Sequence, residues 1–370
     1  MKTLDKPVPP GGNSSHVVPP GGTIGIIGGG QLGRMMALAA SRLGLKALIY
    51  SDVPDVPAFQ VTPLQLVAPY DDRATLSGMA NACHAVTYEF ENIPAEAMAF
   101  LADLVPVRPG AKALATTQDR LTEKNFVASL GLKTAPFFEV SSAGQAREAF
   151  NQLQGEGILK TRRFGYDGKG QMRAISADDA ALAFAALKEA PCILEGFVDF
   201  AFEASVVAAR GADGSFAAYD PPENVHEHHI LRRSTVPGRL TPAQGGEAKA
   251  IARKIADALD YVGVLAVELF VGKDGGLTVN EIAPRVHNTG HWTIEACACS
   301  QFEQHIRAVA GWPLGDATRH ADAVMENIIG DEVRAWESLA CGGALHLYGK
   351  KDAKPGRKMG HVTRLAPKGR

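Results

Sequence analysis

Short apolar runs alternate with amphipathic segments of helical spacing along most of the chain, which is the pattern of an α/β protein. In the first part, strands are predicted at residues 23–27, 47–50 and 85–90, and a helix at 34–42. A glycine-rich turn separates the first strand from the helix, an order typical of a dinucleotide-type fold. We therefore predict a Rossmann-like first domain over residues 23–115.

The middle of the chain contains fewer elements. An amphipathic helix is predicted at 119–130, closed by Gly131, and an alanine-rich helix at 177–190. An apolar strand follows at 193–198. We assign these elements to a small second domain over residues 116–197.

The last part is richest in strands. These are predicted at 203–210, 215–219, 264–271, 277–282 and 344–348, with helices at 247–259 and 293–310. Residues 221–239 are polar and are expected to form a loop. We assign residues 198–370 to one large domain with a C-terminal subdomain.

Composition narrows the class of protein. The 370 residues are 46% hydrophobic with a net charge of −2, so no basic excess favours nucleic acid or an acidic membrane. No apolar run reaches the ~18–20 residues of a membrane helix. Residues 1–22 are rich in Pro, Gly and Ser, and we expect a disordered leader. The scattered cysteines favour reduced thiols and a cytoplasmic protein: Cys83, Cys192, Cys297, Cys299 and Cys341.

The first glycine turn is a candidate phosphate site. Gly28, Gly30 and Gly33 match G-x-G-x-x-G, and Asp52 follows about twenty residues on. The same geometry places any phosphate at a helix N-terminus, so NAD is only one possible ligand. Glu89 lies near the end of the next buried strand, where an acid can meet a ligand or remain solvated.

A second candidate is the stretch 157–171, GILKTRRFGYDGKGQ. Its strand ends on Lys160, a compact charge that can reach phosphate oxygens. Glycines in the loop that follows allow backbone amides to approach a ligand closely. We predict a polyphosphate loop, with a solvated hairpin tip as the alternative.

The next strands suggest sites for the other parts of a nucleotide. Glu195 interrupts an apolar strand and needs a partner, because an unpaired buried carboxylate is costly. Residues 195–198 could border an adenine, and Glu203 could bind a ribose. His226, His228 and His229 invite a zinc interpretation, but their spacing does not match H-E-x-x-H.

A predicted hairpin gives the sharpest expectation. If Asp274-Gly275 is a two-residue turn, Glu268 lies directly opposite Glu281 on one face. Two facing carboxylates repel, and a hard divalent cation such as Mg²⁺ would resolve this. A shared proton or an exposed pair is the alternative. Asn280 would point to the opposite face unless a bulge turns it.

These stretches together resemble the ATP-grasp superfamily, and within it the N5-carboxyaminoimidazole ribonucleotide synthetases of purine synthesis. The resemblance runs from Ile24 to about Val362. Its motifs are GGGQLGRM, QDRLTEK, ILKTRRFGYDGKGQ, ILEGFV with Glu203, NEIAPRVHNTGHWT and PGRKMGH.

The resemblance implies an ATP-grasp fold with a Rossmann-like pre-ATP-grasp domain, a small lid domain and a C-terminal α+β domain. It also implies a ligase that carboxylates 5-aminoimidazole ribonucleotide with bicarbonate, using ATP and Mg²⁺ and forming carboxyphosphate. A homodimer is expected, with small-molecule substrates and no nucleic-acid or membrane partner. The loop 165–170 would close over the reactants.

The resemblance also assigns roles to residues. ATP would contact Arg120, Lys160, Gly165, Asp167, Gly168, Gly170, Glu195, Gly196, Phe197, Val198, Glu203, His226, Asn280 and Glu281. The ribonucleotide would contact Gly30, Gln31, Leu32, Glu89, Asn92, Tyr166, Arg285, His287, Asn288, Lys350 and Arg357. Glu268, Glu281 and Asn280 would hold Mg²⁺. Catalytic roles are implied for Tyr166, Asp167, Arg285 and Lys358.

Three other interpretations stay open at this point. An NAD-dependent dehydrogenase would use the first glycine turn and Asp52, but it leaves the Glu268–Glu281 pair unexplained. An ATP-grasp ligase could use formate or an amino acid instead. A nucleotide sensor on the same fold would bind the ligands without turnover.

Overall fold

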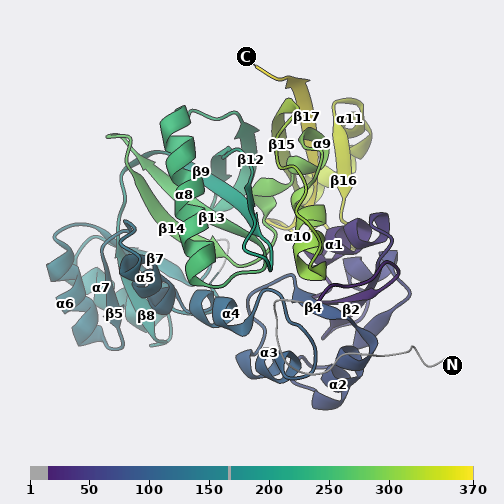
Figure 1. The fold of residues 1–370 in the computed structure, drawn as a ribbon. Coiled ribbons are helices and arrows are strands. Elements are labelled where there is room, and N and C mark those ends of the chain that lie inside the picture. Colours follow the sequence, from purple (N-terminus) through teal and green to yellow (C-terminus); the bar gives the residue numbers. More distant parts are fainter. Residues whose placement is uncertain (1–15, 166–167, 370) are drawn as a thin grey trace.

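The computed structural model describes residues 16–165 and 168–369. Three sheets, each with its own helices, surround a central junction (Figure 1). Their arrangement agrees with the predicted α/β class. No helix in these described ranges is long and apolar enough to cross a membrane.

The N-terminal sheet is parallel, with strand order β3-β2-β1-β4. All residues of β1 and β4 are buried, as expected for central strands covered on both faces. The elements of this part are β1 (Thr23–Ile27), α1 (Gln31–Arg42), β2 (Lys46–Ser51), η1 (Pro57–Val61), β3 (Gln65–Val67), α2 (Arg73–Ala82), β4 (Ala85–Tyr88), α3 (Ala95–Ala102) and α4 (Ala111–Thr117).

The second sheet is antiparallel, with strand order β5-β8-β6-β7. It forms the small lobe opposite the N-terminal domain in Figure 1, where α6 and α7 pack together. Its elements are α5 (Arg120–Ser129), β5 (Phe137–Val140), α6 (Ala143–Leu153), β6 (Gly157–Thr161), β7 (Gln171–Ala174), α7 (Ala177–Ala186) and β8 (Cys192–Gly196).

The third sheet has nine strands in the order β14-β13-β9-β11-β12-β15-β17-β16, with β10 paired to β9. Its strands are β9 (Phe200–Arg210), β10 (Phe216–Ala218), β11 (Glu223–Glu227), β12 (Ile230–Val236), β13 (Gly263–Gly272), β14 (Leu277–Ala283), β15 (Ala321–Ile329), β16 (Ala344–Leu347) and β17 (Lys358–Pro367). Its helices are α8 (Pro242–Ala258), η2 (Asn288–Gly290), α9 (Thr293–Ala296), α10 (Gln301–Ala310), η3 (Gly330–Ala335) and α11 (Trp336–Cys341).

Helix α10 connects the large sheet to the N-terminal domain. It packs on β13 and β9 on one side and on α1 and β4 on the other. This contact fixes the carboxyl edge of the N-terminal sheet relative to β13 and β14. The functional site forms at this junction.

Three sequence predictions on secondary structure are wrong. The polar segment 221–239 forms the hairpin β11–β12, and Leu231, Ser234 and Val236 are buried in its second strand. Helix α8 begins at Pro242 rather than at 247, since Thr241 caps it. The predicted helix 293–310 is interrupted after Ala296, and Ser300 caps a new helix there.

The expected disordered leader also requires correction. Residues 1–15 lie outside the described part, but residues 16–22 pack on α10 and the segment that follows it. Val18 is fully buried; its N–H donates to the Ala310 carbonyl at 2.8 Å, and its carbonyl accepts from Trp312 Nε1 at 2.7 Å. An apolar side chain inside a Pro- and Gly-rich segment is sufficient to anchor it.

Candidate active site

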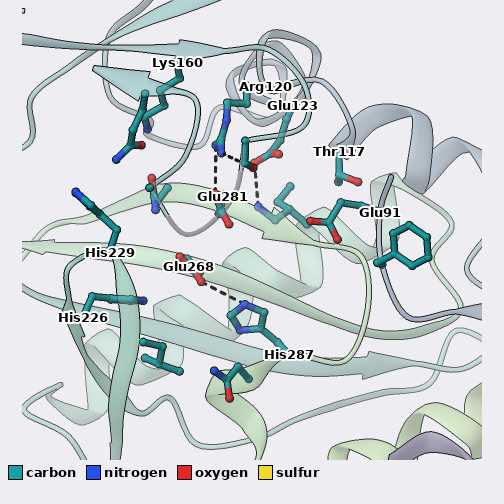
Figure 2. A pocket seen from close by; sticks show the side chains of 18 of the residues that line it. Glu91, Thr117, Arg120, Glu123, Lys160, His226, His229, Glu268, Glu281 and His287 are labelled. Carbon is teal, nitrogen blue, oxygen red and sulfur yellow. Dashed lines mark hydrogen bonds and ion pairs between the residues drawn. The ribbon is translucent and has the colours of Figure 1, made fainter. Parts of the chain in front are cut away.

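A cavity of about 850 Å³ lies where the three parts of the chain meet. Figure 2 shows its centre, where dashed lines join Arg120 to Glu281 and His287 to Glu268. The predicted residues that line it are Gly30, Gln31, Leu32, Glu89, Asn92, Arg120, Lys160, Gly165, Gly168, Phe197, Glu203, His226, Glu268, Asn280, Glu281, Arg285, His287, Asn288 and Lys358.

Other predicted residues lie elsewhere. Tyr166 and Asp167 are outside the described residues. The residues that do not line the cavity are Gly170, Glu195, Gly196, Val198, Lys350 and Arg357. Among residues 195–198, therefore, Phe197 alone lines it, and its own N–H already donates to the Glu156 carbonyl at 2.9 Å.

The predicted pairing of Glu268 with Glu281 is confirmed, but the predicted turn is wrong. Gly272 pairs with Gly276, so the loop has three residues, Lys273 to Gly275, with Gly275 at φ 82°. With this three-residue loop and a regular ladder, Asn280 would lie opposite Glu268. A bulge between Glu268 and Leu269 makes Asn280 the extra residue and restores Glu281 to that place.

The two carboxylates differ in exposure: the Glu268 side chain is 16% exposed and the Glu281 side chain 39%. Burial, with the adjacent Glu281, raises the pKa of Glu268 to about 7. His287 Nε2 lies 3.3 Å from Glu268, and Arg120 Nη1 lies 3.2 Å from Glu281. Two facing carboxylates, beside the Asn280 that lines the same cavity, form a donor set that fits Mg²⁺.

A buried triad supports the lysine of the predicted phosphate loop. Lys160 donates to Glu195 at 3.1 Å, and Lys124 Nζ lies 3.4 Å from the same oxygen. Burial opposes ionisation of Glu195, but Lys160, Lys124 and Arg120 hold its pKa at about 2. Two cations against one anion leave a net positive charge facing the cavity. Such a charge favours a polyanion.

The sequence did not indicate a role for Lys124 or Glu123. Both were expected on the polar face of the amphipathic helix. Both are buried. Glu123 accepts the Ile282 N–H at 2.9 Å, and Lys124 donates to the Asn280 carbonyl at 2.6 Å. These contacts fix α5 to the bulged strand that carries Glu281. The sequence feature that could have pointed to them is the pair of opposite charges at adjacent positions in DRLTEKNF.

The pH dependence of stability should report on Glu123. Burial, with Glu281 nearby, raises the pKa of Glu123 from 4.5 to about 8. A folded-state pKa above the unfolded value means that folding binds a proton, so stability falls as pH rises between these values. Without metal or nucleotide, we expect the free energy of unfolding to fall from about pH 5 to about pH 8.

In Glu123→Gln this fall should be smaller by roughly 1–3 kcal/mol, because glutamine still accepts the Ile282 amide without ionising. Urea unfolding at several pH values measures the difference. Equal pH slopes for the two proteins would contradict a neutral, buried Glu123.

The first glycine turn is closed by a side chain of the protein. Glu89 accepts the N–H groups of Gly30 and Gly33, the latter at 2.6 Å. Gly28 has φ 109°, and a Cβ there would meet Glu89 at 2.3 Å. The carboxylate thus occupies the helix terminus where a dinucleotide would place its pyrophosphate. This arrangement argues against the NAD interpretation.

The other side of the cavity carries a second group of polar residues. Arg285 forms a two-armed contact with Glu91, at 2.6 and 3.2 Å, which joins the large domain to the N-terminal domain. The side-chain amide of Asn288 is buried, with neither its oxygen nor its nitrogen hydrogen-bonded within the described residues. An unsatisfied buried amide in a cavity wall points to a polar ligand.

The predicted basic turn lies behind this wall. Lys350 donates to the Lys358 carbonyl at 2.8 Å, and Arg357 donates to the Asp352 carbonyl at 3.1 Å. Lys358 itself lines the cavity. Positive charge is therefore available here, although two of the three predicted cations are turned towards backbone carbonyls.

The histidine segment does not form a zinc site. His226 Nδ1 lies 2.8 Å from Glu203, and although burial lowers the pKa of His226, this contact raises it overall. Within the described residues, His228 and His229 do not join His226 in a group of metal-ligating side chains. Both line the cavity beside Gly168 instead.

Three family models match successive parts of the chain. They are the ribonucleotide synthetase preATP-grasp domain at residues 22–118, the ATP-grasp domain at 125–302 and the phosphoribosylaminoimidazole carboxylase C-terminal domain at 323–369. With the cavity described above, these matches define an ATP-grasp ligase.

Relatives specify the family further. The chain is 53% identical over 353 residues to the N5-carboxyaminoimidazole ribonucleotide synthase of Brucella melitensis, covering 94% of this chain and 98% of that protein. It is 42% identical to the Bacillus subtilis enzyme, covering 95% and 93%. The chain belongs to the N5-carboxyaminoimidazole ribonucleotide synthase family.

Solved structures agree with this assignment. The ADP complex of an N5-carboxyaminoimidazole ribonucleotide synthetase superimposes with a TM-score of 0.92 at 42% identity, covering 95% of this chain and 94% of that one. The Aspergillus clavatus enzyme with ADP and 5-aminoimidazole ribonucleotide gives a TM-score of 0.88 at 31% identity, covering 94% of each chain.

Proposed function

We infer that this protein carboxylates 5-aminoimidazole ribonucleotide with bicarbonate, at the expense of ATP, to give N5-carboxyaminoimidazole ribonucleotide, ADP and phosphate. One observation carries the inference. The opposed carboxylates Glu268 and Glu281 line one cavity together with the cations Arg120, Lys160 and Arg285. This arrangement suits a phosphoryl transfer next to an acceptor.

ATP is proposed to lie between the small lobe and the hairpin. Lys160 and Arg120 face the triphosphate, with the positive charge of the Glu195 triad behind them. Phe197, exposed at the end of β8, offers an apolar surface for the adenine, and Glu203 offers a carboxylate for the ribose. Solved relatives in complex with ATP and with ADP support nucleotide binding by this family.

Mg²⁺ is proposed at Glu268, Glu281 and Asn280. When bound there, it neutralises charge on the phosphates during transfer. The residues around it act independently of the ion: Arg120 orients Glu281, and His287 orients Glu268. Burial and the adjacent Arg285 and Lys358 keep the pKa of His287 well below its ordinary value, so the ring is neutral.

The reaction proceeds in two balanced steps. A bicarbonate oxygen attacks the γ-phosphorus of ATP, the bond to the β-phosphate oxygen breaks, and carboxyphosphate and ADP form. The exocyclic amine of the ribonucleotide then attacks the carboxyl carbon of carboxyphosphate, or of CO₂ released from it. The bond from that carbon to the phosphate oxygen breaks, and phosphate takes up the amine proton. Arg285 is proposed to orient the bicarbonate and the amine, and Asn288 to bind the ribonucleotide. Tyr166 and Asp167 stay predictions for this step.

Phosphate release tests this function. With ATP, Mg²⁺ and bicarbonate present, addition of 5-aminoimidazole ribonucleotide should stimulate phosphate release by at least tenfold. Stimulation by formate or an amino acid instead would favour another ATP-grasp ligase. Ligand binding without any turnover would favour a nucleotide sensor.

We also propose that the protein is a homodimer acting on small molecules in the cytoplasm. All five cysteines are free thiols, which is typical of a reducing compartment. Size-exclusion chromatography with light scattering measures the oligomeric state directly.

A further inference from the structure

Two histidines and a glutamate meet outside the cavity, in the C-terminal part of the large sheet. His346 on β16 lies directly opposite His361 on β17, and their rings stack with centroids 4.6 Å apart. Glu295 comes from α9, and its Oε1 lies 2.6 Å from His346 Nε2. One ligand atom from each of the three residues lies within 4.8 Å of the others.

Two atoms of this cluster lack partners. His361 is fully buried, and its Nδ1 is 2.8 Å from the Tyr348 hydroxyl. Its Nε2 is buried with no hydrogen-bond partner among the described residues, and so is Oε2 of Glu295. Leaving two such atoms unsatisfied costs free energy, so the cluster is better suited to a ligand than to apolar packing.

The donor chemistry selects the kind of ligand. Two imidazole nitrogens and one carboxylate oxygen suit zinc and similar transition ions, whereas Mg²⁺ prefers oxygen alone. Tyr348 fixes the orientation of the His361 ring through Nδ1, as outer partners of metal-bound histidines do. Burial, with His291 and His346 nearby, keeps the pKa of His361 well below its ordinary value, so the ring is neutral as a ligand must be.

The cluster is also accessible. The His346 side chain is 33% exposed, which gives an ion a path from solvent. Binding would replace the hydrogen bond between His346 and Glu295, and its proton would be released to solvent.

We propose that Glu295, His346 and His361 bind one zinc-type divalent cation, separate from the Mg²⁺ proposed in the cavity. Such an ion would tie α9 to β16 and β17. The loop before α9 carries His287 and Asn288, and β17 begins at Lys358, so both tied segments reach the acceptor side of the cavity.

Metal titration of the full chain tests the site. Mg²⁺ is kept in excess to occupy the hairpin carboxylates, and Co²⁺ or Zn²⁺ is added while absorption or heat is recorded. We expect one equivalent per chain and a rise in melting temperature on Zn²⁺ binding. His346→Gln and Glu295→Gln should each weaken binding by at least tenfold.

His229→Gln is the matched control. His229 is an exposed histidine that lines the cavity, where added Zn²⁺ could also bind. It should bind Zn²⁺ as the unchanged protein does. Equal affinity in His346→Gln, Glu295→Gln and the unchanged protein would overturn the proposal, and so would loss of binding in His229→Gln alone. The melting temperatures without metal establish that the two cluster variants are folded.

Discussion

Replacing Glu281 with glutamine is expected to lower the rate of ATP-dependent carboxylation by about 10²–10³-fold. The side chain keeps its size and can still accept a hydrogen bond from Arg120, which lies 3.2 Å away. What it loses is one of two opposed negative charges. The proposed Mg²⁺ would then bind more weakly, and charge on the transferring phosphoryl group would be less well stabilised.

The change should appear mainly as a higher Mg²⁺ requirement and a lower kcat, measured by phosphate release over a range of Mg²⁺ concentrations. Glu247→Gln serves as the control, since Glu247 is an exposed carboxylate on α8 outside the cavity. An unchanged Mg²⁺ dependence in Glu281→Gln would remove Glu281 from the proposed metal site.

The second large effect is expected at Arg285. Arg285→Lys keeps the charge but cannot form the two-armed contact with Glu91 that joins the large and N-terminal domains. We expect stimulation of phosphate release by 5-aminoimidazole ribonucleotide to fall by about 10²-fold. Binding of ADP should change little, because Arg285 is proposed to contact the bicarbonate and the acceptor amine, not the nucleotide.

Separate titrations of ADP and of the ribonucleotide distinguish these two effects. Arg253→Lys is a suitable comparison, since Arg253 forms a surface pair with Asp257 on α8. Equal losses of ADP and ribonucleotide binding in Arg285→Lys would indicate general damage to the junction between the domains. That result would contradict a specific role for Arg285 in binding the ribonucleotide.

Local patterns in the sequence predicted most of the elements that build this site. The buried strands β1 and β4 and the hairpin β13–β14 follow from apolar runs bounded by turn residues. The pairing of Glu268 with Glu281 was also predicted, although through a two-residue turn. The three-residue loop shifts the strand register by one residue, and the one-residue bulge shifts it back. Neither feature has a clear sequence signal.

Contacts between distant segments could not be predicted in this way. Lys124 and Glu195 are 71 positions apart in the sequence, and only the tertiary structure brings their side chains to 3.4 Å. Glu89, which was predicted to contact the substrate, lines the cavity, and its carboxylate also accepts the Gly33 N–H at the N-terminus of α1. In each case the side chain is suited to more than one partner, and tertiary structure decides which one it meets.

The bulge at Asn280 has a consequence for how this strand can vary in length. Removing one residue from a strand normally turns every following side chain to the other face. Here Glu268 pairs with Glu281, and Leu269 pairs with Val279, so Asn280 has no paired residue on β13. A homologous chain lacking this one residue would keep both carboxylates opposed and lose only the amide. The two opposed carboxylates are thereby insulated from a deletion at the position beside them.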